Sequence, residues 1–509
     1  MMRRTTRTLA AFAAAAGLAT LGACRAARAT ATVPSPQSGP LSTGSNAALR
    51  TAIDSMADAA QFANAHWGIL IVDPERGDTL YARNAGKLFM PASNMKILTT
   101  STALTQLGPD YRYHTVFAAR GAVTSGVLGG DLVVVGRGDP SVSDHMLGDA
   151  MLPLRAIADS IAARGITRIA GRVVAGGDAF PGEVFGYGWT YDDFEDSYSA
   201  PIDELLFNEG FSVLHVRGGD KPGDPVQVET RPAHTFPTVR VAATTGQPQS
   251  AQQGARRRGN TLVARKDSVS WDIVLTGEIA PHDTATIEVT HHDPDRAYLA
   301  AMREALRDKG ITIDDAVTDT LAALTPLATL SSPPLRDILK AVLKPSQNQV
   351  AEMLFRTVAL EATGAGRTDS ARAVVERQIA AWGVSVPNEA VVRDGSGLAR
   401  YDYVSPRTLV RILDAMRKSP SFSAFYDALP IAGVDGTLAG RMKGTLAENN
   451  VHAKTGSVAQ ARSLSGYVMT ADHHMLIFSF LANNWTTSVR AVEQVQDVIA
   501  ARLAAMRLR

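Results

Sequence analysis

A serine and a lysine stand three positions apart in the segment 91–96, directly before an apolar run that predicts a buried helix. In a helix, residues three apart share one face, so the amine of Lys96 can point back at the hydroxyl of Ser93. A serine hydroxyl is a poor nucleophile until an adjacent base accepts its proton. The free N–H groups of a first helical turn can also receive a developing oxyanion. The pair therefore predicts nucleophilic catalysis by Ser93, with Lys96 as its base.

Two later segments carry polar residues that fit the same chemistry. The patterns differ in how often they are expected by chance. A Ser-x-x-Lys pair alone is expected roughly once or twice by chance, and the alternative is an N-cap serine with a surface lysine one turn later. Ser346 and Asn348 form a weak second pair, because Ser346 can simply cap the helix that follows it. The triplet Lys454-Thr455-Gly456 is more specific, since it is expected by chance only about 0.1 times.

The elements that must position these residues are strands and helices in two separated parts of the chain. Strands are expected before Ser93 and around Lys454, and a hairpin is expected after it: Trp67–Val72, Thr79–Ala82, Val451–Ser457, Ser463–Met469 and Met475–Ala482. Helices are expected at Pro294–Lys309, Pro334–Val342, Gln347–Thr363 and Val489–Leu508. Gly395 and Gly397 predict a tight loop in the segment 394–400, before the last of these helices.

The segment between these parts has a different texture, with short Val-rich stretches separated by Gly, Pro and Asp. It predicts strands at Asp131–Val135, Arg172–Ala175, Ser212–Val216, Val226–Thr230, Thr238–Ala242, Thr261–Arg265, Ser268–Gly277 and Thr284–Val289, with one helix at Met151–Arg164. We therefore expect a mostly β insertion of one or two subdomains. The predicted division is 1–46 leader and tether, 47–110 first catalytic part, 111–293 insertion and 294–509 second catalytic part.

The N-terminus predicts export. Residues 1–7 are basic, and the apolar run 9–21 is too short to span a bilayer. The sequence Leu-Gly-Ala-Cys ending at Cys24, the one cysteine of the chain, resembles the lipobox of bacterial lipoproteins, which predicts lipidation of Cys24. The alternative is cleavage by an ordinary signal peptidase near Ala27 or Ala29. In either case the mature protein has neither a disulfide nor a cysteine nucleophile. Residues 28–46, rich in Ala, Thr, Ser, Pro and Gly, predict a flexible tether.

Composition excludes some partners. Hydrophobic residues make up 45% of the chain, as in a soluble globular protein. The 51 Lys and Arg residues balance 50 Asp and Glu residues, so the net charge does not indicate a nucleic-acid-binding protein. The adjacent histidines at 291–292 and 473–474 lack ligand spacing, because neighbours on a strand point to opposite faces. We expect no metal and no cofactor.

Taken in order, the three motifs are similar to those of the serine penicillin-binding proteins and β-lactamases. The gap of about 250 residues between the first two motifs resembles, more narrowly, that of the class C low-molecular-mass D-alanyl-D-alanine carboxypeptidase/endopeptidases. Further segments similar to that family are Gly136–Pro140, Tyr198–Pro201, Asp394–Leu398 and Gly436–Leu438. The resemblance implies an α/β (α+β) fold: a penicillin-binding-protein/β-lactamase-like transpeptidase domain whose antiparallel sheet is flanked by helices and split by a mostly β insertion.

The resemblance also implies a role for each motif residue. Ser93 would attack the carbonyl of the penultimate D-Ala, and Lys96 would accept its proton. Ser346 would pass that proton to the leaving amine, while Asn348 would hold the substrate amide and Lys96. Lys454 would attract the terminal carboxylate, beside the remaining residues of its strand: Thr455, Gly456 and Ser457. The backbone N–H groups of Ser93 and Ser457 would form the oxyanion hole. Lys96 must be neutral to act, and burial together with Lys454 would favour that state.

A side-chain pocket for the stem peptide is implied as well. Asp193 and Arg400 match the family positions that hold a free amine and a carboxylate, which a meso-diaminopimelate end carries together. Asp402 stands where the family usually has Asn, so the chain departs from the pattern there.

The implied partners are peptidoglycan stem peptides ending in D-Ala-D-Ala and, as covalent inhibitors, β-lactams. The implied location is the periplasm or cell envelope, with a lipid anchor at Cys24 as the one link to a membrane. Two alternatives stay open at this point. One is a β-lactamase or esterase on the same scaffold, although no deacylating Glu is recognisable. The other is a catalytically silent envelope protein that binds peptidoglycan, although its motifs would be expected to decay.

Overall fold

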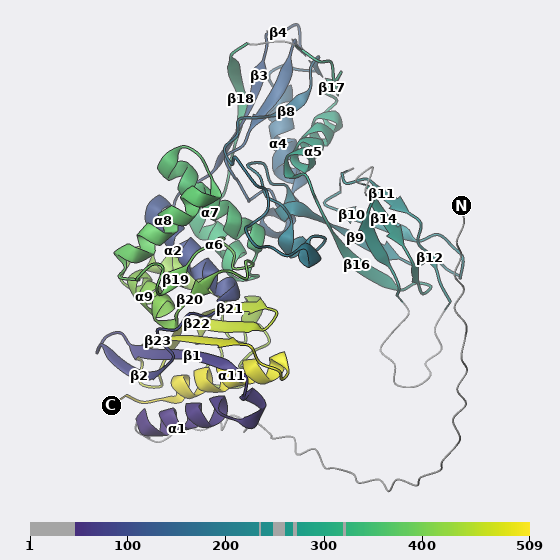
Figure 1. The fold of residues 1–509 in the computed structure, drawn as a ribbon. Coiled ribbons are helices and arrows are strands. Elements are labelled where there is room, and N and C mark those ends of the chain that lie inside the picture. The colour runs from purple at the N-terminus through teal and green to yellow at the C-terminus, as the bar shows by residue number, and fades with distance from the viewer. Residues whose placement is uncertain (1–45, 234–235, 248–259, 268–271, 319–321, 509) are drawn as a thin grey trace, which may run out of the picture. The chain divides into compact units, whose positions relative to one another are not determined.

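The computed structural model describes residues 46–233, 236–247, 260–267, 272–318 and 322–508 (Figure 1). The predicted leader, almost all of the tether and Cys24 lie outside these ranges. Within the described part of the chain, no helix is both long enough and apolar enough to cross a membrane.

A five-stranded antiparallel sheet joins the two ends of the described chain, in the order β2-β1-β23-β22-β21 (Figure 1). Its strands are β1 (His66–Asp73), β2 (Asp78–Arg83), β21 (His452–Val458), β22 (Ala461–Met469) and β23 (Met475–Asn483). The sequence-based predictions for all five are confirmed to within two residues at each end. Trp67 of β1 pairs with Ala482 of β23, and Lys454 of β21 pairs with Ser465 of β22. Strand β21 is therefore an edge of the sheet.

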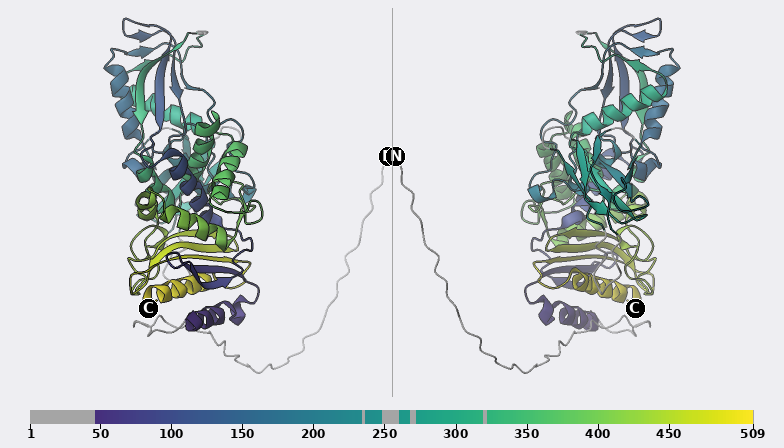
Figure 2. Two further views of the ribbon diagram at one scale, coloured as in Figure 1. Left: turned by 90° about the vertical axis from the view of Figure 1, so that its left-hand side faces the viewer. Right: turned by 90° about the vertical axis from the view of Figure 1, so that its right-hand side faces the viewer.

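Helices cover both faces of this sheet. On one face lie α1 (Asn46–Ala57) and α11 (Val489–Ala505) (Figures 1 and 2). They share a core with β1 and its neighbours through side chains such as Ile53, Ile71 and Ile499. The other face is covered by α2 (Met95–Leu107), α6 (Leu335–Leu343), α7 (Asn348–Thr363), α8 (Thr368–Ala381), α9 (Pro406–Arg417) and α10 (Phe422–Ala428). Because helices cover both faces, residues 67–71 of β1 are all buried, and the strand lacks the alternation of buried and exposed side chains. The predicted fold class is confirmed.

The middle of the chain forms several smaller sheets around two cores. The first core packs α4 (Met151–Ala162) and α5 (Pro294–Asp308) against a sheet ordered β18-β3-β6-β8, and the second is built by strands alone. The strands of the first sheet are β3 (His114–Arg120), β6 (Asp131–Val135), β8 (Val173–Gly176) and β18 (Leu324–Ser331). Those of the second core include β9 (Phe211–Arg217), β10 (Gln227–Arg231), β11 (Val239–Val241), β13 (Val263–Lys266), β14 (Ile273–Thr276) and β16 (Thr284–Thr290).

Strands β3 and β18 of the first core were not predicted from the sequence. Strand β18 contains Pro326, which lacks an N–H group and weakens a strand pattern, and the ladder with β3 is irregular at that residue. Helix α5 and β18 follow residue 293, yet they share a core with α4 and β3. The division into domains stays a prediction, and this shared core favours extending the inserted part to about Ser331.

Candidate active site

Ser93 lies in a short 3-10 turn, η2 (Ala92–Asn94), that runs directly into α2. The first ten residues of α2 are buried, so the helix is surrounded by protein. Lys96 is completely buried, whereas Ser93 is half-exposed. The Nζ atom of Lys96 lies 3.0 Å from the Ser93 Oγ, as the three-residue spacing predicts. The alternative of a surface lysine is thereby excluded for Lys96.

Two further oxygen atoms accept hydrogen bonds from Lys96. They are Oδ1 of Asn348 at 2.6 Å and the backbone carbonyl of Ser396 at 2.8 Å. Burial lowers the pKa of Lys96 to about 7, against the opposing pull of nearby carboxyl groups led by Asp394. A base with a pKa near 7 is half neutral at neutral pH, which suits it to accept a proton there.

Ser346 lies in the turn between α6 and α7, and the alternative that it caps the N-terminus of α7 is wrong. An N-cap residue needs extended backbone angles, but Ser346 has a φ of 69°. The cap is Gln347, whose side chain accepts a hydrogen bond from the N–H of Gln349. The left-handed backbone of Ser346 instead presents its hydroxyl to Lys454, whose Nζ donates to it at 2.8 Å. The motif that contains Ser346 and Asn348 is therefore joined to the Lys454-Thr455-Gly456 motif.

Lys454 on β21 is completely buried, and its amine interacts electrostatically with that of Lys96. Burial lowers its pKa well below the usual range, and repulsion from Lys96 lowers it further. The expected repulsion between the two lysines thus acts on the pKa of Lys454, while burial accounts for that of Lys96. The carbonyl of Lys454 accepts a hydrogen bond from Asn94 at 2.8 Å, which ties β21 to the turn that carries Ser93.

Gly456 allows β21 to run against that turn. A Cβ atom at this position would stand 2.1 Å from Oγ of Ser463, 2.5 Å from the carbonyl oxygen of Pro91 and 3.0 Å from the backbone nitrogen of Ser93. Its two neighbours face outward: Ser457 is exposed, and the Thr455 hydroxyl donates to Thr437 at 2.7 Å. The edge strand therefore presents Thr455 and Ser457 on the surface beside Ser93.

The middle of the chain contacts the N-terminus of α7 beside the motif residues. The Nδ2 atom of Asn348 donates to the carbonyl of Tyr198 at 2.8 Å. Gln349 donates to the carbonyls of Ser197 and Ala200. The segment around Tyr198 was singled out by resemblance alone, and these bonds give it a physical function, which is to hold the N-terminus of α7 in place.

Asp193 and Arg400 lie on two segments that touch each other. Asp193 accepts hydrogen bonds from the hydroxyls of Thr190 at 2.6 Å and Tyr198 at 2.7 Å. The preceding residues pack on the loop that carries Arg400, since the rings of Tyr187 and Tyr401 lie 5.9 Å apart. No hydrogen bond or ion pair joins Asp193 to Arg400, and Arg400 has no such partner among the described residues.

The glycine loop between β19 (Ala390–Val391) and β20 (Tyr403–Val404) closes the back of the site. Asp394 accepts hydrogen bonds from the N–H groups of Gly397 at 2.6 Å and Ala399 at 2.7 Å. Gly397 has a φ of 81°, and a Cβ atom there would stand 1.9 Å from the carbonyl oxygen of Ala92. The loop thus needs glycine both for its conformation and for its approach to η2. Asp402 is buried within the loop and accepts a hydrogen bond from the N–H of Arg393, so it faces the loop backbone.

Sequence analysis missed two residues that hold this loop. Glu352 of α7 accepts hydrogen bonds from the N–H groups of Gly395 at 3.0 Å and Ser396 at 2.7 Å. The Nε1 atom of Trp189 donates to Asp394 at 2.9 Å. Glu352 had a detectable signal, because it follows Asn348 by four positions and therefore shares its face of the helix. Trp189 had none, since its partner is about 200 residues away.

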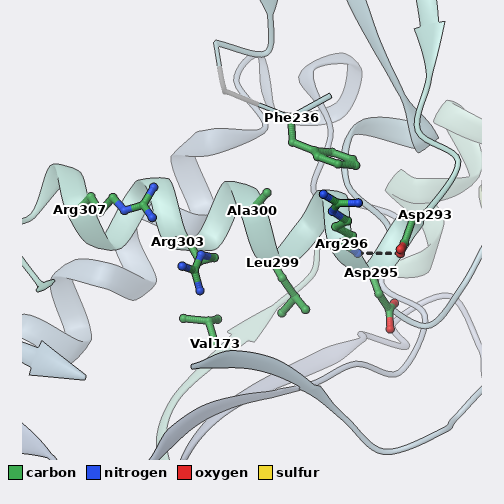
Figure 3. Close-up of a pocket in the computed structure, with 9 residues that line it drawn as sticks. All are labelled: Val173, Phe236, Asp293, Asp295, Arg296, Leu299, Ala300, Arg303 and Arg307. Atoms are coloured by element: carbon green, nitrogen blue, oxygen red, sulfur yellow. Dashed lines mark hydrogen bonds between the residues drawn. The ribbon is translucent and has the colours of Figure 1, made fainter. Parts of the chain in front are cut away.

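A separate pocket of about 580 Å³ lies along α5 and β8, lined by Arg296, Arg303 and Arg307 among others (Figure 3). None of its residues belongs to the cluster around Ser93. The residues of the three motifs therefore lie apart from this pocket, beside β21.

A helix-flanked antiparallel sheet with a serine and lysine on its central helix and a second lysine on its edge strand defines the penicillin-binding-protein and β-lactamase class of folds. The chain belongs to the D-Ala-D-Ala carboxypeptidase 3 (S13) family, whose model matches residues 49–506. It is 34% identical over 475 residues to a D-alanyl-D-alanine carboxypeptidase of an Actinomadura species, covering 90% of this chain and 84% of the relative.

Another relative agrees with this assignment, and a solved structure shares the fold. The D-alanyl-D-alanine carboxypeptidase DacB of Haemophilus influenzae is 27% identical over 421 residues, which cover 79% of this chain and 82% of that protein. The crystal structure of penicillin binding protein 4 (dacB) from the same organism matches with a TM-score of 0.71 at 21% identity, over 89% of this chain and 97% of that one. It shows a shared fold.

Proposed function

We propose that this chain releases the terminal D-alanine of peptidoglycan stem peptides through an acyl-enzyme formed on Ser93. The chain is a D-Ala-D-Ala carboxypeptidase of the S13 family with a penicillin-binding-protein fold. The observation that carries the assignment of residues is the set of contacts that joins Ser93 to Lys96 and Asn348, with Lys454 and Ser346 paired beside them.

The first step is attack by the Ser93 Oγ on the carbonyl carbon of the penultimate D-Ala. As the bond forms, the neutral amine of Lys96 takes the hydroxyl proton across their 3.0 Å contact. Ser346 then donates its hydroxyl proton to the amine of the departing D-Ala as the peptide bond breaks, and receives in its place the proton that Lys96 took from Ser93. Water later cleaves the ester, which restores Ser93 and frees the shortened peptide. Asn348, held by Tyr198 on one side and by Lys96 on the other, orients the substrate amide.

The edge strand supplies the binding groups. Lys454 provides the attraction for the terminal carboxylate of the substrate, with the hydroxyls of Thr455 and Ser457 beside it. The backbone N–H groups of Ser93 and Ser457 stabilise the negative oxygen of the tetrahedral intermediate. Gly456 supports this arrangement, because any side chain there would push β21 away from the backbone of Ser93.

Assays on three kinds of compound separate this proposal from its alternatives. The protein without its leader should release D-alanine from a peptide ending in D-Ala-D-Ala. A β-lactamase would instead hydrolyse benzylpenicillin rapidly without a lasting adduct, and an esterase would cleave simple esters while sparing the peptide. A silent binding protein would retain peptidoglycan and turn over none of these compounds. Absence of D-alanine release would contradict the proposal.

We expect Asp193 to bind the side chain of the third residue of the stem peptide. Its carboxylate is oriented by two hydroxyls and paired with no cation in the described chain, which leaves it free to meet an amine. Losing one partner of a desolvated charge pair typically costs about 2 to 5 kcal/mol, roughly 30-fold or more in kcat/KM. Asp193→Ala should therefore impair stems with a free diaminopimelate end by that factor, with Arg400 holding the neighbouring carboxylate.

The matched substrate is diacetyl-Lys-D-Ala-D-Ala, which lacks the free amine. Its turnover and the rate of penicillin acylation should be nearly unchanged in Asp193→Ala. Equal losses on both peptides would mean that Asp193 supports the fold and that the pocket lies elsewhere. The same pocket would admit the D-Ala to diaminopimelate cross-link, because that bond also follows a D-Ala carbonyl. Endopeptidase activity is thus part of the proposal.

We also propose that the chain is exported to the periplasm or envelope and anchored by a lipid on Cys24. The support is the leader sequence and the lipobox-like Leu-Gly-Ala-Cys segment. Globomycin should make the unprocessed precursor accumulate, and the mature protein should begin at Cys24. A mature N-terminus beyond Cys24 would contradict the anchor and leave export unaffected.

A further inference from the structure

Three buried carboxyl groups lie behind Lys96. Glu352 of α7 is 3% exposed, and Asp394 and Asp402 of the glycine loop are completely buried. Lys96 reaches this cluster through the backbone of Ser396, whose carbonyl accepts from its amine at 2.8 Å while the Ser396 N–H donates to Glu352 at 2.7 Å. The Gly395 N–H donates to the same Glu352 oxygen. One backbone segment is thus held between a carboxylate and the presumed base.

This arrangement fixes the direction of the Ser396 carbonyl. A buried N–H group that loses its acceptor is costly, so removal of Glu352 would leave two such groups to find new partners by moving the loop. A moved loop would take the Ser396 carbonyl away from Lys96, which would then keep only Ser93 and Asn348 as hydrogen-bond partners. The position of the base therefore depends on a side chain that never touches it.

The cluster also acts on Lys96 through charge. Two cations interact with the three carboxyl groups, Lys96 from α2 and Arg356 from α7, and Lys454 from β21 interacts in turn with Lys96. Burial and, after it, the charge of Asp394 raise the pKa of Glu352 to about 7. The carboxyl groups hold the pKa of Lys96 up against burial, at about 7. Lys96 and Glu352 therefore change protonation over the same range of pH.

We propose that Glu352 is a positioning residue for the reaction, which aims the Ser396 carbonyl at Lys96 and supplies negative charge that keeps Lys96 basic enough to deprotonate Ser93. The inference rests on the proposed function, because it takes Lys96 to be the base. It adds a residue outside the three motifs and explains why a carboxyl group is buried where an apolar side chain would be cheaper to place.

Two substitutions separate the two effects. Glu352→Gln keeps an oxygen that can accept from Gly395 and Ser396 but removes the charge. Lys96 then loses a stabilising anion, so its pKa falls and the acid limb of the kcat/KM profile should move to lower pH by roughly one unit. Penicillin acylation, which needs the same base, should show the same shift. Glu352→Ala removes the acceptor too and should slow acylation by roughly tenfold or more at every pH.

Glu389→Gln is the matched control. Glu389 is also a buried glutamate that accepts from a backbone N–H, that of Ser385, and it pairs with Arg407 and Arg411. It lies outside the lysine cluster, so its loss should lower the unfolding temperature and leave the pH profile in place. A folded Glu352→Gln protein with an unmoved acid limb in both assays would overturn the inference. A wild-type protein that is neither active nor acylated would overturn the proposed function and this inference together.

Discussion

Replacing Lys96 with methionine should slow the acylation of Ser93 by benzylpenicillin by about 100- to 10,000-fold, the usual contribution of a general base. Methionine fills a similar volume in the buried site but cannot accept the Ser93 proton. The loss should appear in kcat/KM for D-alanine release as well, because both reactions begin with attack by the same hydroxyl. Stopped-flow measurement of acylation at pH 8, where Lys96 with a pKa of about 7 is mostly neutral, gives the clearest comparison.

Lys340→Met is the control for this substitution. Lys340 is an exposed lysine on α6 that pairs with Asp337 and contacts none of the motif residues. Its replacement should leave acylation unchanged. If Lys96→Met folds with its thermal transition intact and still acylates at the rate of the wild type, Lys96 is not the base.

Substituting Gly456 with alanine should lower kcat/KM by about 100-fold or more, since a displacement of about 1 Å at a catalytic centre can cost that much. The new Cβ would lie 2.1 Å from the Ser463 Oγ and 2.5 Å from the carbonyl oxygen of Pro91. Strand β21 must then move away from the turn that carries Ser93, together with Lys454. Steady-state kinetics on diacetyl-Lys-D-Ala-D-Ala measures the effect.

Gly440→Ala provides the comparison, because a Cβ at Gly440 would meet no atom within 4 Å. This variant should keep wild-type activity and slightly raise stability through the unfolded chain. Equal activity of Gly456→Ala and the wild type would mean that the substrate does not bind beside β21.

Sequence alone could predict the parts of this protein whose signal is local. The three motifs, the five strands of the central sheet and the helices α5, α6, α7 and α11 all follow from spacing and periodicity within short windows. Ser93 and Lys96 meet because a helix places residues three apart on one face. The middle strands were also found where valine runs mark them.

The rest depends on contacts between distant segments, which no short window contains. For Ser346 the resemblance implied a catalytic role and the sequence alone an N-cap, and only its left-handed backbone shows that its hydroxyl accepts a hydrogen bond from Lys454. Glu352 shares a helix face with Asn348, but its bonds to the glycine loop appear only in the folded chain. Strand β18 was hidden by Pro326, and its partner β3 is about 200 residues earlier. Such features are fixed by tertiary packing and become visible only in the folded chain.

Mass spectrometry of the penicillin-treated protein tests the central claim most directly. The account predicts one added penicilloyl group on the peptide that contains Ser93, and none on the Ser93→Ala protein, which should also stop releasing D-alanine. The penicillin resembles the D-Ala-D-Ala end and traps the same acyl-enzyme, so the adduct marks the nucleophile itself. An adduct on any other residue, or D-alanine release that survives Ser93→Ala, would contradict the account.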